Sequence, residues 1–267
     1  MLTSTALIAA MAFAPGQGGL TLSNARVTFG ELGSTRPDVK FLPNDIFFIS
    51  FDIDGIKIDE NGRVRYSMAM EVVDKDNKVI FKQQPIDRED FVPLGGSKLP
   101  ARAFVTLMPD QTDGAYTCRV TVTDRSTKAS QTIEQKFEVL KKDFGIVVVY
   151  TSADGKGEIP TPQIGAAGQL IFVHFAVCGF SRDAKTKQPN VTVEMVVLAR
   201  DGGATLPKPS TFTVDREVAQ TDTVIPLRSA LPLNRAGDFT VELKAVDNVS
   251  KGKPVKVSFP IRVVPTN

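Results

Sequence analysis

The sequence contains little of what most catalytic and metal sites are built from. Its 267 residues include one histidine and two cysteines, and tryptophan is absent. These counts leave few residues for histidine-based catalysis or for a His/Cys metal site, which usually needs several such ligands. We therefore predict that the protein is not an enzyme, has no catalytic, cofactor-binding or metal-binding residues and uses no cofactor.

Motifs of the common reaction classes are missing too. There is no G-x-S-x-G nucleophile turn and no glycine-rich phosphate-binding loop. Any Ser-His-Asp triad would have to use His174, which we expect to lie exposed or against a neighbouring domain. Carboxylate pairs need no histidine, so glycosidase-type chemistry stays formally open. The acidic residues, however, fall mostly in turns.

Charge and hydropathy exclude several further classes. The 32 basic residues nearly balance the 30 acidic ones, which does not favour a nucleic-acid binder. Apolar residues make up 42% and charged residues 23%, as in ordinary globular proteins rather than disordered, collagen-like or multi-span membrane chains. We predict that the chain is not transmembrane.

The amino terminus has the character of an export signal. Residues 6–14 form a short uncharged apolar run, too short for the roughly 20 residues of a membrane span. Small residues allow cleavage, best after Ala12, although no Lys or Arg precedes the run. We predict a signal segment at 1–19 and a secreted, periplasmic or cell-envelope protein. The alternative is a disordered apolar tail, and whether the segment is cleaved is left open.

From Leu20 onward, alternation of apolar and polar residues dominates, and helical periodicity is absent. A period of two is typical of half-buried strands, and Asp-, Asn- and Gly-rich turns separate the runs. Short alternating strands with polar turns predict β-sandwiches. The predicted strands are 46–54, 63–73, 104–108, 116–124, 132–140, 145–151, 169–177, 190–199, 222–227, 238–246 and 255–264.

The two halves of the chain match each other in order, at offsets from 124 residues (179 − 55) to 122 (259 − 137). Two copies of one unit are therefore expected, at 20–141 and 142–267. The junction near residues 141–143 lacks Gly, Pro and Ser, so the copies should not tumble freely. The matches are Phe51-x-Ile53-x-Gly55 with Phe175-x-Val177-x-Gly179, Asp59 with Asp183, Met108-Pro109 with Leu231-Pro232, Gly114-x-Tyr116-Thr117 with Gly237-x-Phe239-Thr240, Asp124 with Asp247, and Phe137-x-Val139 with Phe259-x-Ile261.

The repeated segments 114–124 and 237–247 resemble the penultimate strand of immunoglobulin-like and fibronectin type III-like domains. Such domains are common in exported bacterial proteins, and the resemblance implies two consecutive immunoglobulin-like β-sandwiches without pointing to a specific named family. A tyrosine at this place can form a tyrosine corner by bonding nearby backbone. Tyr116 is suited to this, whereas Phe239 lacks the hydroxyl. The alternative is that both rings simply fill the cores.

The two cysteines are expected to stay free thiols. Alternation places Cys118 inward in the first copy and Cys178 on the face of His174 and Ala176 in the second. A disulfide needs Cα atoms within about 7 Å, which two faces of two domains do not favour.

The densest acidic cluster is Asp52, Asp54 and Asp59. Loops of sandwiches can supply the several oxygen ligands that calcium prefers. The matching second-copy positions include Ala176 and Cys178, which offer no oxygen. The alternative is a strand end followed by a solvated turn, and whether calcium binds there is left open.

The leading functional prediction is a non-catalytic structural or binding module of the cell envelope or extracellular space. Its partner would be a protein or cell-envelope component. Loops 54–64 and 124–130, and their counterparts 179–190 and 247–254, should form one end of each sandwich and offer contact surfaces. The alternatives are a periplasmic, strand-donating chaperone and a carbohydrate-binding accessory domain.

Overall fold

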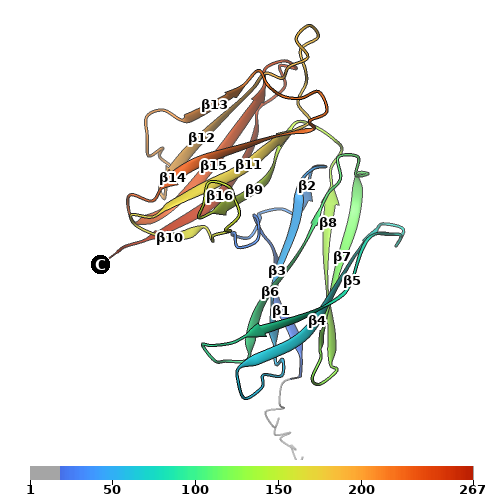
Figure 1. The fold of residues 1–267 in the computed structure, drawn as a ribbon. Helices are drawn as coiled ribbons and strands as arrows, with labels where there is room; N and C mark the ends of the chain where they lie inside the picture. The colour runs from blue at the N-terminus through green and yellow to red at the C-terminus, as the bar shows by residue number, and fades with distance from the viewer. Residues whose placement is uncertain (1–18, 267) are drawn as a thin grey trace, which may run out of the picture.

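A computed structural model describes residues 19–266, so the predicted signal segment lies outside the described residues except for Gly19. The described residues form two β-sandwiches, one from β1 to β8 and one from β9 to β16 (Figure 1). They contain no helix, and thus none long and apolar enough to span a membrane. The predicted all-β fold is confirmed.

Both sandwiches have the same topology. In the first, β1-β3-β6 faces β2-β8-β7-β4-β5, and in the second β14-β11-β9 faces β10-β16-β15-β12-β13. The first sandwich consists of β1 (Thr21–Val27), β2 (Lys40–Phe41), β3 (Ile46–Asp54), β4 (Arg63–Asp74), β5 (Val79–Phe91), β6 (Lys98–Thr106), β7 (Gly114–Asp124) and β8 (Ser130–Val139). The second consists of β9 (Gly145–Ser152), β10 (Ile164–Ala166), β11 (Leu170–Cys178), β12 (Val191–Ala199), β13 (Ser210–Val214), β14 (Val224–Pro232), β15 (Gly237–Asp247) and β16 (Val255–Val264).

The internal repeat is confirmed strand by strand, since β1 to β8 recur in order as β9 to β16. Loop geometry repeats as well: Gly55 and Gly179 have φ of 69° and 65°. Lys128 and Lys251, in corresponding turns, have φ of 64° and 54°. The exact boundaries 20–141 and 142–267 stay a prediction, with residues 140–144 connecting β8 to β9.

Two of the sequence matches are displaced. Tyr116 pairs with Phe137 whereas Phe239 pairs with Ile261, so Phe137 corresponds to Ile261 and not to Phe259. A slip of two residues keeps the same side chains inward, so alternation conceals it.

The other displaced match is Met108-Pro109 with Leu231-Pro232. Leu107 donates its N–H to the Asp45 carbonyl, and Leu233 does the same to Gln169, so these two leucines correspond. From Leu107 to Gly114 is 114 − 107 = 7 positions, whereas from Leu233 to Gly237 is 237 − 233 = 4. The connection from β14 to β15 is therefore three residues shorter than that from β6 to β7.

Each sandwich has its own apolar core, formed by the inward faces of its two sheets. In β3, alternate residues from Phe47 to Ile53 are at most 1% exposed. Burying one such side chain contributes about 1.5–3 kcal/mol before the entropy of ordering the chain is subtracted.

The loop between β1 and β2 of the first sandwich packs into the second sandwich. Phe29 of this loop lies in the second core, with its ring centroid 5.9 Å from that of Phe259. Arg36 lies over the Phe41 ring at 4.2 Å and donates to the Asp45 carboxylate at 3.0 Å. The contact between the sandwiches therefore has an apolar part, Phe29, and beside it lies a buried ion pair of the first sandwich.

Asp45 also holds a strained residue of the second sandwich. Its carboxylate accepts the backbone N–H of Val148 at 2.8 Å. Val148 has φ of 55°, which is uncommon for a β-branched residue, and lies where the pairing of β9 with β11 shifts. Asn24 takes the same conformation (φ 54°) at the matching irregularity of β1, and asparagine tolerates it better.

Candidate functional site

The three aspartates of the acidic cluster have different partners: Asp52 and Asp54 lie beside one lysine, and Asp59 lies in a turn. Asp52 accepts hydrogen bonds from Asn24 at 2.7 Å and from Lys98 at 3.3 Å. Lys98 also lies 3.6 Å from Asp54, so the cation beside both carboxylates is a lysine. Asp59 instead accepts the backbone N–H groups of its own turn. Within residues 19–266, no group of three or more His, Cys, Asp or Glu side chains is arranged to hold a metal ion.

The loops predicted to share one end of each sandwich do meet. Asp124, at the end of β7, accepts the N–H of Lys57 at 2.9 Å, and Asp247 accepts that of Ser181 at the same distance. Burial alone would raise the pKa of both carboxyls, but these N–H groups and those of the following turns lower it below 3.8. Both aspartates are thus structural, and they anchor equivalent loops.

His174 lies in a buried polar cluster. Its Nε2 is 2.7 Å from Ser152 Oγ, its ring stacks on Tyr150 at 4.7 Å, and Ser152 donates to the Asp154 carbonyl at 2.6 Å. Burial lowers the pKa of the imidazole. A Ser–His pair at this distance is suited to nucleophilic catalysis, but Ser152 is fully buried and uses its proton on a backbone carbonyl.

Both cysteines are free, as predicted, and both are buried. Cys118 is in the first core, and burial raises the pKa of its thiol to about 12. Cys178 packs with Ala176 and with Leu42 of the first sandwich, and burial raises the pKa of its thiol to about 12 as well. Neither thiol is suited to react at neutral pH.

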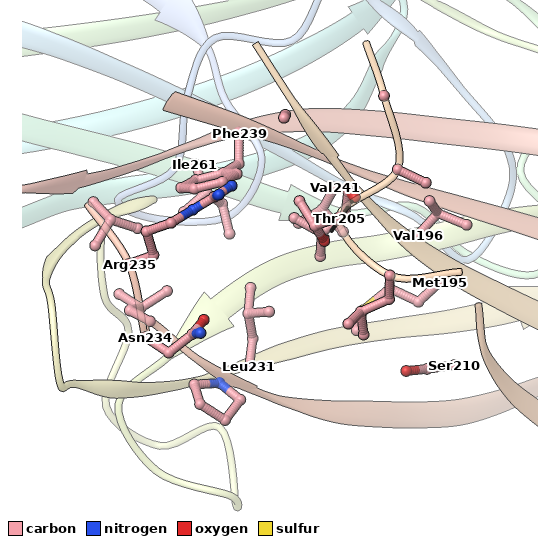
Figure 2. Close-up of a pocket in the computed structure, with 18 of the residues that line it drawn as sticks. Met195, Val196, Thr205, Ser210, Leu231, Asn234, Arg235, Phe239, Val241 and Ile261 are labelled. Atoms are coloured by element: carbon pink, nitrogen blue, oxygen red, sulfur yellow. Dashed lines mark hydrogen bonds between the residues drawn. The ribbon is translucent and has the colours of Figure 1, made fainter. Parts of the chain in front are cut away.

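A cleft of about 700 Å³ lies in the second sandwich. It opens between the edge strands β13 and β14 and is referred to below as the cleft. Figure 2 shows Arg235 against Phe239 at one end, with Met195 and Ser210 toward the other. Its apolar walls are formed by Met195, Val197, Leu206, Leu231, Leu233, Phe239, Val241, Ile261 and Val263.

The corresponding end of the first sandwich is filled by a four-ring stack of Phe41, Phe47, Tyr116 and Phe137. Phe137 is its centre, with ring centroids 4.5 Å from Phe47, 5.5 Å from Tyr116 and 5.8 Å from Phe41. All four side chains are at most 5% exposed. This stack closes the end of the first core.

In the second sandwich, three of these four rings are missing. Strand register places Gly165, Ile171, Phe239 and Ile261 at the positions of Phe41, Phe47, Tyr116 and Phe137. Leu233 takes part of the space, because a Cβ added to Gly165 would lie 2.5 Å from its Cδ1 atom. Of these four positions, Phe239 and Ile261 line the cleft.

The tyrosine corner marks the same difference. Tyr116 donates its hydroxyl proton to the Thr112 carbonyl at 2.6 Å, which confirms the corner in the first sandwich. In the second, the connection is shorter and Phe239 lacks the hydroxyl. The Arg235 guanidinium instead lies over the Phe239 ring, 5.3 Å from its centroid.

A shorter edge strand also leaves the cleft open. In the first sandwich β5 pairs with β4 from Arg63 to Val73. In the second, β13 pairs with β12 only as far as Met195. The loop 200–209 then turns back, joined to β12 by hydrogen bonds from Ala199 to Gly203 and from Thr205 to Val197.

The mouth of the cleft carries cations without acidic partners. Within the described part of the chain, no carboxylate lies within 4.0 Å of Lys208 or Arg235, or of Arg200 in the adjoining hollow. The acid of the lining, Asp201, accepts the N–H of Gly203 at 2.9 Å. The cleft therefore combines apolar walls with positive charge at its opening.

Sequence reasoning missed the cleft. The signal was present, because Phe137 and Phe47 of the first copy have aliphatic counterparts in the second. To recognise this difference, Phe137 must be matched with Ile261, and the sequence comparison had matched it with Phe259 instead.

No family model matches the sequence, and no curated protein matches it. Among solved structures, the chain is similar to a red sea bream transglutaminase, with 10% identity and a TM-score of 0.29 over 92% of this chain and 31% of that one. It is also similar to the C-terminal domain of the antigen I/II polypeptide BspA of Streptococcus agalactiae, with 10% identity and a TM-score of 0.31 over 91% of this chain and 100% of that domain. The C-terminal domain of AspA, an antigen I/II-family protein of Streptococcus pyogenes, gives 10% identity and a TM-score of 0.31 over 92% and 100%.

Proposed function

We propose that the protein is a non-catalytic structural or binding module that acts at the cell envelope or outside the cell. The observation that most supports this proposal is the contact between the sandwiches. Phe29 and Asp45 of the first are built into the second, so the two hold their loops in a constant relative orientation. Loops on a rigid scaffold are well suited to binding.

The non-catalytic part of the proposal is supported by the polar groups that resemble catalytic ones. Ser152 and His174 are buried, and both thiols are protonated at neutral pH. Asp52 and Asp54 share Lys98. Each group is accounted for by a structural contact.

Export is tested by fractionating the native organism and crosslinking the protein in place. We expect it in the envelope or the medium, crosslinked to envelope proteins or polymers that mass spectrometry identifies. Recovery in the cytoplasm, crosslinked to soluble metabolic enzymes, would contradict the proposal.

Rigidity is tested by small-angle X-ray scattering of an Asp45→Ala variant. The change leaves the Val148 N–H and the Arg36 guanidinium without their acceptor, so the sandwiches should separate and the radius of gyration should rise. Asp113→Ala, which removes an exposed carboxylate from a loop of the same sandwich, is the matched control. Identical scattering from wild type and both variants would show that this contact does not hold the pair.

One observation favours a carbohydrate-binding role as a second candidate. Phe48 and Phe104 lie 5.4 Å apart on the outer face of β3 and β6, and Phe104 is 57% exposed. Exposed rings on a flat sheet can stack on sugars. A glycan array probed with wild type and Phe104→Ala tests this, and signals that are equal in both would remove the candidate.

Strand donation is not favoured by the edge of the first sandwich. The edge strand β5 carries Pro85, which lacks an N–H, and charged residues such as Lys82 and Asp87. These features are typical of edges that avoid pairing with another chain.

A further inference from the structure

We infer that the cleft of the second sandwich binds an amphipathic anion, with a linear acyl chain between the sheets and an acidic head group at one of the two cations of the lining, Lys208 or Arg235. This inference deepens the proposed binding role and rests on it. The binding test below uses the purified protein and is independent of the fractionation test, so either can fail alone.

The volume and the walls are suited to an apolar chain. About 700 Å³ is within the range of 300–1,000 Å³ that small-molecule sites usually have. Val241 and Ile261 at the base are at most 2% exposed, and they belong to the core itself. A chain entering here would therefore extend the hydrophobic core rather than cover a surface.

An exposed apolar side chain on the lip indicates incomplete closure. Leu206, in the loop between β12 and β13, lines the cleft and is 64% exposed. Its counterpart region in the first sandwich is the hairpin of β4 and β5, whose strands stay paired as far as Val73. An acyl chain between the sheets would remove part of the Leu206 side chain from water.

The cations at the mouth select the head group. Lys208 and Arg235 have no carboxylate within 4.0 Å among residues 19–266, and Asp201 is engaged with backbone. The Arg235 guanidinium lies over Phe239 and is oriented by this contact, so its N–H groups remain available for two parallel bonds to a carboxylate or phosphate. Asn234 lies beside Arg235 in the lining, and Ser210 lies toward the other end of the cleft (Figure 2).

Two kinds of ligand combine an acyl chain with an acidic head group: a free fatty acid and an anionic lipid in a membrane. The probe for the first is cis-parinaric acid, whose fluorescence rises in apolar surroundings, displaced by palmitic acid. We expect saturation at one site per chain and displacement by palmitic acid. Hexadecanol, which lacks the charge, should displace about tenfold more weakly, as expected for the loss of a charge-assisted contact.

For the second source, the protein is sedimented with vesicles of phosphatidylglycerol or phosphatidylcholine. Co-sedimentation with phosphatidylglycerol alone, lost in the double variant below, assigns the head group to a membrane lipid. Binding of the soluble acid without co-sedimentation assigns a free fatty acid. Failure of both overturns the inference.

Two sets of variants locate the site. Lys208→Gln with Arg235→Gln should weaken binding about tenfold or more. Lys142→Gln with Lys156→Gln removes two exposed cations outside the cleft lining and should bind as wild type does. Equal binding by both double variants would overturn the inference.

Ile261→Phe restores the ring of the first sandwich and fills the base of the cleft. We expect binding to be lost while the circular dichroism spectrum and melting temperature stay at or above those of wild type. Should this substitution disturb the fold, Val197→Phe fills the cleft from β12, two strands away in the same sheet, with the same expected loss. Wild-type binding by a folded, filled variant would overturn the inference.

Discussion

The two sandwiches share one topology but close their cores differently at one end. In the first, four aromatic rings meet around Phe137 and a tyrosine corner ties down the loop beside them. In the second, Gly165, Ile171 and Ile261 replace three of those rings, and a cleft of about 700 Å³ opens. The cleft is thus lined at the position where Ile261 replaces Phe137, and the strand order is the same in both sandwiches.

The outer faces of the two smaller sheets differ in a related way. In the second sandwich, Ala176 and Cys178 pack under Leu42 of the first. Strand equivalence puts Asp52 and Asp54 at these positions in the first sandwich, where they pair with Lys98 and remain partly exposed. Small apolar residues allow one sandwich to dock on the other, whereas paired charges keep the same face in water.

The largest expected effect is a difference in the stability lost when the core is truncated at the closed end of the first sandwich and at the open end of the second. Phe137→Ala should lower the free energy of unfolding by about 3–5 kcal/mol, because it empties the centre of a closed stack. Ile261→Ala should cost only about 2 kcal/mol, at the low end for such changes, because its site already borders an open cleft. Urea titrations followed by circular dichroism measure both, and equal losses would contradict the proposed difference in packing.

The next largest effect is the stability lost when the loop-anchoring aspartate is replaced, and it should be the same in both sandwiches. Asp124→Ala and Asp247→Ala should each cost about 2–3 kcal/mol, because each leaves several loop N–H groups without their charged acceptor. The pKa of both carboxyls is lowered, so their stabilisation is present above pH 3.8 and is lost as pH falls below it. Urea titrations at pH 7 and at pH 3 check both points. Clearly unequal losses at pH 7 would contradict the equivalence of the two loops.

A smaller effect is expected at the tyrosine corner. Tyr116→Phe should cost about 1 kcal/mol, because it removes the hydrogen bond to the Thr112 carbonyl. Phe239→Tyr should change stability by less than about 0.5 kcal/mol, as surface changes usually do, because the ring borders the cleft and its hydroxyl would reach water. Melting temperatures of both variants provide the measurement, and a clear gain from Phe239→Tyr would show that the shorter loop can form a corner too.

The smallest effect concerns His174, which occupies the position of Ser50. Because burial lowers its pKa below 6.5, the unfolded chain binds protons first as pH falls, and stability should decrease below about pH 6.5. The imidazole faces Tyr150, Ser152, Asp154 and Arg228, and the backbone and charge of Asp154 partly offset the lowering of its pKa by burial. His174→Gln should flatten the dependence of melting temperature on pH between 7 and 5. An unchanged slope in the variant would assign the dependence to other groups.

Alternation identified most core strands because one face of each is buried. The predicted ranges 46–54 and 255–264 match β3 and β16, but 104–108 captured only the end of β6. The edge strand β5 was missed, because both of its faces are largely exposed and it contains Pro85. Periodicity reports burial on one side, and edge strands lack that contrast.

For the candidate site, sequence reasoning correctly gave free thiols and the meeting of the loops at Asp124 and Asp247. It left the tyrosine corner open beside the alternative that the rings simply fill the cores. It placed no weight on Phe29 or Asp45, whose partners lie in the other sandwich. It also gave no indication of the cleft, because a cavity depends on the summed volume of side chains from five strands.

What the sequence determined by itself is the β class, the duplication and the inward face of most strands, because these depend on alternation and turn residues close together in the chain. Only the tertiary structure decided which strands are in register, that the first sandwich is built into the second, and that one core is closed and the other open. These depend on contacts between residues more than 100 positions apart, such as Val148 with Asp45 at a separation of 103, for which no local pattern exists.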